Sequence, residues 1–141
     1  MRAVSKPACR VFRQDDTYDG KQGLTYASGI SAETAGAKGV CMHVLTMQPG
    51  DRAKAHFHEN HETAIYMISG VTEMWYGEEL EQHLIVKEGE MLYIPAGVPH
   101  LPMNTSDAPA TAVLARTDPN EQESVSLRPD LDALFEQRGM R

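Results

Sequence analysis

Residues 50–70 read GDRAKAHFHENHETAIYMISG, and residues 89–104 read GEMLYIPAGVPHLPMN. His56 and His58 are two residues apart, so in an extended strand both imidazoles project from the same face and can reach one ion. His100 must arrive from another strand. Pro95 and Gly97 stand just before it, and because proline fixes φ while glycine permits a tight reversal, His100 is held firmly after a turn. The two stretches predict a metal site shared by separate strands.

The rest of the chain has the pattern of an all-β protein. Apolar segments rich in β-branched and aromatic residues alternate with turn-forming residues, and most are too short for the helices of a bundle. Strands that are this short and this closely spaced favour a barrel or a jelly roll. We expect strands at residues 24–30, 40–47, 63–68, 72–76, 82–86, 91–94 and 111–116.

The two ends of the chain differ from this pattern. Residues 1–20 carry mixed charge and weak periodicity, which indicates an N-terminal arm or an edge strand. Residues 129–141 predict a C-terminal helix, because Pro129 suits a first helical turn and Leu131, Leu134 and Phe135 form an apolar stripe. We expect this stripe to pack against the barrel or a neighbouring subunit. The barrel itself is predicted over residues 21–128.

Composition excludes several classes of partner. The 141 residues include 13 Lys and Arg against 20 Asp and Glu, a formal net charge of −7. Nucleic-acid affinity comes mainly from basic side chains that neutralise phosphates, so nucleic acids and anionic membrane surfaces are not expected partners. The first residues contain no apolar leader, and no apolar run is long enough for a membrane span, so we expect a cytoplasmic protein. Two cysteines form neither a disulfide framework nor a thiolate metal signature.

Two spacings resemble the conserved motifs of the cupin superfamily, as found in small bacterial single-domain cupins. The first is Gly50-x5-His56-x-His58-x3-Glu62 followed by Gly70, and the second is Gly89-x5-Pro95-x-Gly97-x2-His100-x3-Asn104. The resemblance implies an all-β double-stranded β-helix, or jelly-roll barrel. It also implies one divalent metal ion inside the barrel on His56, His58, Glu62 and His100, and a homodimer as the assembly.

The fourth ligand is the point at which this sequence departs from the motif. Six residues usually separate the glutamate from the closing glycine, whereas seven lie between Glu62 and Gly70. Anchoring the alignment of the motif at Gly70 puts Thr63 in the glutamate position, and anchoring the alignment at the histidines puts Glu62 there. We favour Glu62, because a β-bulge can absorb an extra residue and threonine is a poor ligand for a divalent ion. His61 is the competing fourth ligand.

Other residues are weaker candidates for the site. Tyr66 and Tyr93 are the candidates for a hydroxyl group in the pocket. His43 and His83 belong to neither motif and are expected at ordinary positions on strand faces. No catalytic residue outside the metal ligands is assigned from the sequence.

Three imidazoles and one carboxylate leave part of an octahedral shell open for substrate or O₂. The ligand set suits iron, manganese, zinc, nickel or copper, and ligand type alone does not choose among them. We expect iron or manganese first. The sequence therefore predicts a metal-dependent enzyme, a dioxygenase or an isomerase or lyase, for a small oxygen-rich organic substrate. The alternatives are a non-catalytic module that binds a small ligand or metal, and a metal-free sugar epimerase, which would not need the full ligand set.

Overall fold

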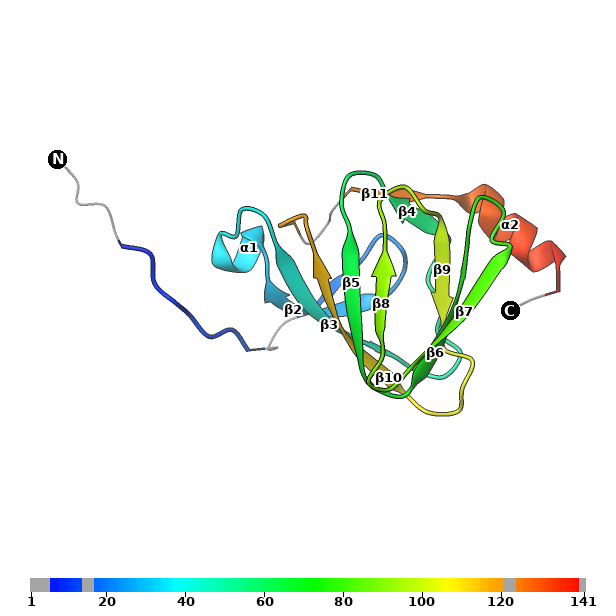
Figure 1. Cartoon of the computed structure of the whole chain (residues 1–141), viewed down its shortest axis with the longest axis horizontal. Helices are drawn as coiled ribbons and strands as arrows, with labels where there is room; N and C mark the ends of the chain where they lie inside the picture. The colour runs from blue at the N-terminus through cyan, green and yellow to red at the C-terminus, as the bar shows by residue number, and fades with distance from the viewer. Residues whose placement is uncertain (1–5, 14–16, 121–123, 140–141) are drawn as a thin grey trace.

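The computed structural model describes residues 6–13, 17–120 and 124–139, and these form two antiparallel β-sheets and two helices (Figure 1). The six-stranded sheet contains, in spatial order, β1 (Thr17–Asp19), β2 (Thr25–Ile30), β3 (Cys41–Met47), β10 (Ala110–Arg116), β5 (Thr63–Ser69) and β8 (Met91–Ile94). The five-stranded sheet contains β11 (Val125–Leu127), β4 (His56–His58), β9 (His100–Met103), β6 (Val71–Tyr76) and β7 (Gln82–Lys87). The helices are α1 (Ala32–Ala35) and α2 (Pro129–Gln137).

This arrangement confirms the all-β jelly-roll prediction with a short C-terminal helix. The predicted strand ranges correspond to β2, β3, β5, β6, β7, β8 and β10. In the described part of the chain the list of expected strands lacks β4, β9 and β11, which are only three or four residues long, and β1 falls within the segment expected to be an arm or an edge strand. Two of these short strands, β4 and β9, carry the histidines of the two motifs. Runs of this length have too few residues for an alternation of apolar and polar side chains to stand out.

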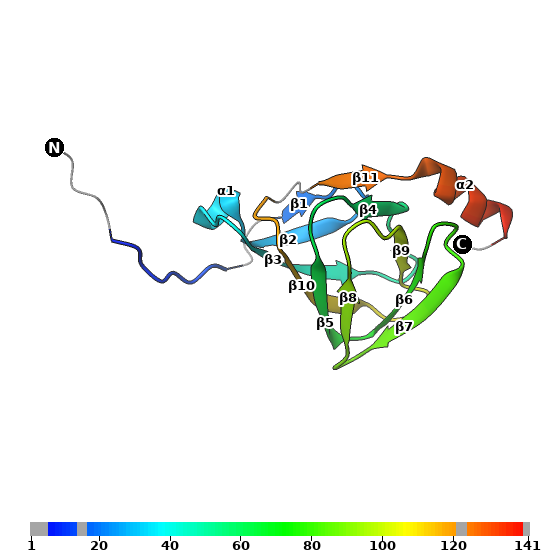
Figure 2. The same cartoon turned by 45° about the horizontal axis from the view of Figure 1, so that its top comes forward.

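Figure 2 shows the two sheets from a tilted view. The core lies between them, because its apolar cluster contains residues of both sheets. Buried and less buried residues alternate along β3 and β10, so that one face of each strand points inward. These inward faces contribute Leu45, Met47 and Leu114 to an apolar cluster, which Met67 of β5 and Val86 of β7 extend across the barrel. The barrel interior therefore has apolar walls, and any polar residue on an inward face is placed among them.

Helix α2 packs against the barrel, one of the two outcomes predicted for its apolar stripe. Leu131 and Phe135 are buried and contact a second apolar cluster that includes Leu101 of β9. Asp132 accepts hydrogen bonds from the guanidinium of Arg52 at 2.9 Å and from the backbone N–H of Ala55 at 3.1 Å. The helix thus holds the backbone immediately before His56 in place.

Residues 6–13 extend away from the barrel in Figure 1 and Figure 2. Residues 6–13 form no helix or strand, and β1 pairs with β2 at the edge of the six-stranded sheet. Residues 1–5 and 14–16 of the predicted arm, and residues 140–141 of the predicted C-terminal helix, lie outside the described residues. Among the described residues, no helix has the length and apolar character needed to cross a membrane.

Candidate metal centre

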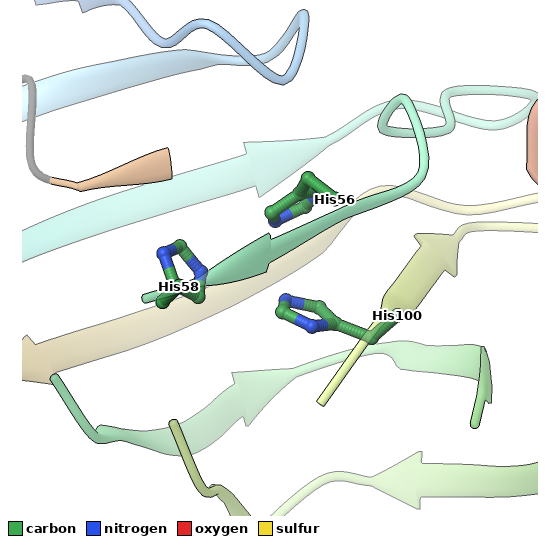
Figure 3. A group of neighbouring side chains, drawn as sticks. All are labelled: His56, His58 and His100. Carbon is green, nitrogen blue, oxygen red and sulfur yellow. The ribbon is translucent and has the colours of Figure 1, made fainter. Parts of the chain in front are cut away.

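His56, His58 and His100 converge inside the barrel from two neighbouring strands (Figure 3). His56 and His100 are direct partners in the antiparallel pairing of β4 with β9, and His58 follows on the same face of β4. One nitrogen from each of the three rings lies within 4.8 Å of the other two. Exposure of each residue is 2–3%. Three imidazole nitrogens at this separation can bind one ion together.

Backbone carbonyls set the orientation of two of the rings. Nδ1 of His56 lies 2.6 Å from the carbonyl oxygen of Lys54, and Nδ1 of His100 lies 2.9 Å from the carbonyl oxygen of Val98. A carbonyl only accepts, so Nδ1 carries the hydrogen and donates in both residues. In a neutral imidazole, Nε2 then keeps a free lone pair. This is the arrangement found for metal-binding histidines, whose second nitrogen donates to an outer group.

Burial keeps these imidazoles neutral. Desolvation lowers the pKa of His100 to about 4 and outweighs the hydrogen bond to Val98, which raises it. Desolvation also lowers the pKa of His56 and of His58, and the neighbouring His100 lowers both further. Near neutral pH the three nitrogens are therefore unprotonated, as metal coordination requires. The residues present fit a divalent ion.

A cavity of about 60 Å³ lies beside the three histidines inside the barrel. Its walls are mainly apolar and include Leu45, Met67 and Leu114. The polar residues that line it, apart from the histidines, are Gln22, Tyr26, Thr63, Thr72 and Arg116. Because one water molecule needs roughly 10–15 Å³ of cavity volume, this cavity can hold several water molecules or one small organic molecule.

The structure places Thr63, and not Glu62, beside the histidines. Thr63 is 2% exposed and lines the cavity, whereas Glu62 is exposed and its Oε1 accepts a hydrogen bond from the hydroxyl of Tyr93 at 2.5 Å. A bulge is present in β5, because the pairing with β10 omits Ile68. The bulge lies beyond Met67, and the pairing with β10 is regular from Thr63 to Met67, so these two buried residues share the inward face. Thr63 thus takes the position that anchoring at Gly70 predicts, and the bulge does not turn Glu62 inward. Among the described residues, the group that could hold a metal contains the three histidines and no carboxylate.

The other candidate residues lie outside this group. His61 is buried next to His58, with ring centroids 4.5 Å apart, and its Nδ1 lies 3.2 Å from Oγ of Ser124. Tyr66 and Tyr93 are 42% and 59% exposed, so neither brings a hydroxyl group into the cavity. Tyr26 does so instead: it is 2% exposed and accepts a hydrogen bond from Gln22.

The two histidines outside the motifs occupy strand faces, as expected. His43 lies on the inward face of β3, and burial followed by the charge of Arg116 lowers its pKa to about 4. His83 lies on β7, where its ring is 4.4 Å from that of Trp75.

Sequence reasoning missed Arg116 altogether. This residue is 3% exposed and lines the cavity at the end of β10. The sequence held a signal for this position, because Ala110, Ala112 and Leu114 alternate with less buried residues and Arg116 continues the same inward face. An arginine on the apolar face of a strand is uncommon enough to indicate a function.

Residues 43–115, just over half of the chain, match the family model of the cupin domain. The chain is a cupin. Protein SchB of Streptomyces halstedii is 31% identical to this cupin over 111 residues, which cover 78% of each protein. This likeness extends beyond the two motifs to most of the barrel.

Solved structures show the same double-stranded β-helix fold. A conserved protein with such a domain from Klebsiella pneumoniae superposes with a TM-score of 0.66 at 19% identity, over 85% of this cupin and 97% of that chain. Oxalate decarboxylase of Bacillus subtilis, which has Mn(II) centres, superposes with a TM-score of 0.62 at 19% identity. That match covers 74% of this cupin but only 27% of the oxalate decarboxylase chain. At these identities the likeness concerns the fold alone.

Proposed function

We propose that this cupin is a divalent-metal-dependent enzyme for a small, oxygen-rich organic substrate. The observation that carries the proposal is the group of three buried imidazoles whose donor atoms lie within 4.8 Å of one another. Two of these rings are oriented by the carbonyls of Lys54 and Val98, so the site is organised before any ion binds. The adjoining cavity supplies the space for a small substrate.

Three neutral ligands leave several coordination positions for other groups. A bound divalent ion would supply Lewis acidity or, if it is redox-active, a site for O₂ chemistry. The chain itself holds the imidazoles in one tautomer and surrounds the reacting groups with apolar walls that exclude water. We favour iron or manganese as the metal, and a dioxygenase or an isomerase or lyase as the class of enzyme. Zinc, nickel and copper are compatible with imidazole ligands as well.

Elemental analysis of untagged protein tests the site. We expect about one equivalent of a divalent metal in the wild-type protein and its loss in His56→Ala and His100→Ala. His83→Ala is the matched control, because His83 is a histidine on β7 away from the group. Circular dichroism checks that the variants are folded. If the His56 and His100 variants retain the same metal as the wild type, the proposed site is wrong.

A second candidate function is a non-catalytic module that binds a small ligand or a metal. One observation favours it: among the described residues that line the cavity, no Asp, Glu, Lys or Cys accompanies the histidines as an evident acid, base or nucleophile. Oxygen uptake and product formation with a panel of hydroxy acids, catechols and diketones separate the two functions. Turnover that follows the metal content across variants supports the enzyme, whereas stoichiometric binding without turnover supports the binding module.

We also propose that the protein is a cytoplasmic homodimer. The outer face of the six-stranded sheet offers a surface for pairing, because several large apolar side chains are exposed on it. These side chains belong to Met42, Tyr66, Ile68, Met91 and Tyr93. Contact between two such faces would remove apolar surface from water. Light scattering tests this, and a monomeric mass at micromolar concentration would contradict it.

A further inference from the structure

Arg116 and Thr63 lie side by side at one end of the cavity. They are direct partners in the antiparallel pairing of β10 with β5, and both side chains are on the inward face. Both also line a second, outer hollow of about 440 Å³ that includes Glu62 and Tyr93. Arg116 and Thr63 therefore stand between the inner cavity and the outer hollow, where a substrate with two polar ends would be held.

Arg116 brings a permanent positive charge close to the three histidines. Its guanidinium lies 5.4 Å from the centre of the Tyr26 ring, and the residue is only 3% exposed. Arg116 lines the same cavity as the three histidines, among mainly apolar walls. Its charge therefore acts within the cavity and is not dissipated in solvent.

Thr63 provides an independent indication of a ligand. Its Oγ1 is buried and has no hydrogen-bond partner among the described residues. A buried hydroxyl without a hydrogen-bond partner destabilises the protein, so such groups are usually explained by a bound molecule or a function. Because this hydroxyl lines the cavity next to Arg116, a ligand that reaches the guanidinium can also accept its hydrogen bond.

The donor groups that line the cavity suit an anion. The guanidinium of Arg116 and the hydroxyl of Thr63 both donate hydrogen bonds, and both residues line it. With Thr63 in the position at which the motif has a glutamate, a divalent ion on three neutral imidazoles would keep its full charge. A metal ion and a guanidinium in the same apolar cavity attract an anionic ligand much more strongly than they would in water.

We propose that Arg116 and Thr63 form a carboxylate-binding subsite, so that the substrate is a small organic acid. This inference rests on the proposed function, because a second oxygen of the acid, from a hydroxyl or carbonyl group, binds the metal on the three histidines. The planar guanidinium matches the two oxygens of a carboxylate, and the hydroxyl of Thr63 donates to one of them. A cavity of about 60 Å³ with apolar walls suits a carboxylate on a short carbon chain better than a bulkier, more strongly hydrated phosphate.

Calorimetric titration with lactate and lactamide tests the subsite. The two molecules have the same size and the same hydroxyl group, and differ in that one has a carboxylate and the other a neutral amide. Protein loaded with Zn(II), which has no redox chemistry, is used so that binding is measured without turnover. We expect Arg116→Met to weaken lactate binding at least tenfold, equivalent to about 1.4 kcal/mol, and to change lactamide binding less than about twofold.

Two further variants distinguish loss of the subsite from misfolding of the protein. Thr63→Val keeps the shape of the side chain and removes the hydroxyl, and we expect it to weaken lactate binding about threefold or more. Arg116→Lys keeps the charge but loses the planar fork, and we expect lactate affinity between those of the wild type and Arg116→Met. Circular dichroism and zinc content are measured for every variant. Equal loss of lactate and lactamide binding in Arg116→Met and Thr63→Val, in folded protein that retains zinc, would overturn the subsite.

The same titrations in metal-free protein separate the subsite from the proposed function. If the wild type retains zinc and lactate binding does not depend on Arg116, the carboxylate subsite is wrong and the metal site stands. If the wild type retains no metal, the proposed enzyme fails. The subsite would then still be supported as an anion site if the metal-free wild type prefers lactate over lactamide and Arg116→Met loses this preference. If the metal-free wild type shows no such preference, the subsite is refuted.

Discussion

Burial of neutral histidines makes the metal-free protein sensitive to acid. Desolvation, followed by the charge of Arg116, lowers the pKa of His43 to about 4, and burial lowers that of His100 to about 4 as well. In the unfolded chain both groups titrate near the ordinary value of about 6.5. Between pH 6.5 and 4 the unfolded state therefore binds protons that the folded state does not, and the free energy of unfolding falls as the pH falls.

The size of this effect follows from the difference between the two pKa values. At pH 5 each of these histidines lowers the free energy of unfolding by up to about 2 kcal/mol relative to pH 7.5, or about 4 kcal/mol together. This contribution is fully present above pH 6.5 and is lost as the pH approaches 4. Since small domains have a total stability of about 5–15 kcal/mol, the loss is large enough to measure.

Urea unfolding at pH 7.5 and pH 5, with a chelator present, provides the assay. We compare wild-type protein with His43→Gln, which removes one buried titrating group without touching the three histidines of the metal site. The variant is expected to lose about 1–2 kcal/mol less than the wild type between the two pH values. His83→Gln, on β7, is the control and should behave as the wild type does. An identical loss in wild type and His43→Gln would refute the assignment of His43 as a buried neutral histidine.

Four other substitutions test the site and the packing. Glu62→Ala should leave the metal content unchanged because Glu62 faces away from the histidines, whereas Thr63→Glu should tighten metal binding about tenfold or more by adding a carboxylate. Competition with a chromogenic chelator measures the metal affinity of both variants. Equal effects of the two substitutions on metal affinity would contradict the placement of Thr63. Gly70→Ala should destabilise the protein by about 2 kcal/mol or more in urea unfolding, because φ of Gly70 is +82° and the added Cβ would lie 2.6 Å from the carbonyl oxygen of Pro109. An unchanged midpoint of urea unfolding would show that this turn can relax. Phe135→Ala should lower the free energy of unfolding by about 3 kcal/mol through loss of packing between α2 and the barrel. A decrease below about 1 kcal/mol in thermal or urea unfolding would mean that the helix contributes little to stability.

The spacing of His56, His58 and His100 was sufficient to predict that the three residues meet. Two positions on one face of a strand and a third after a turn are constraints that depend on backbone geometry, and geometry of this kind is readable from residue spacing. The alternation along β3 and β10 was readable for the same reason. The bounds of the long strands and of α2 therefore agree closely with the prediction.

The residue at the fourth ligand position of the motif could not be predicted from spacing in the same way. A one-residue insertion reverses every side chain between the insertion and the next fixed point, so the choice between Glu62 and Thr63 depended on where the bulge lies. The chemical preference for a carboxylate pointed to Glu62, whereas the regular pairing from Thr63 to Met67 puts Thr63 on the inward face, even though β5 has a bulge at Ile68. Arg116 was missed because the inward alternation of β10 was not followed to the last residue of the strand. Its importance arises from β5 and β10 lying side by side, which is a long-range property of the fold.

The pairing of β4 with β9 connects metal supply to the lifetime of the protein. The strands are joined in register at His56 and His100, so an ion bound by both residues acts as a cross-link between segments more than forty residues apart in the chain. A ligand that binds only the folded state raises its stability by about 4.1 kcal/mol at a free concentration one thousand times its dissociation constant. In a cell short of that metal, the apo-protein would unfold more often and be degraded sooner, so its abundance would follow the availability of the ion without any dedicated regulator.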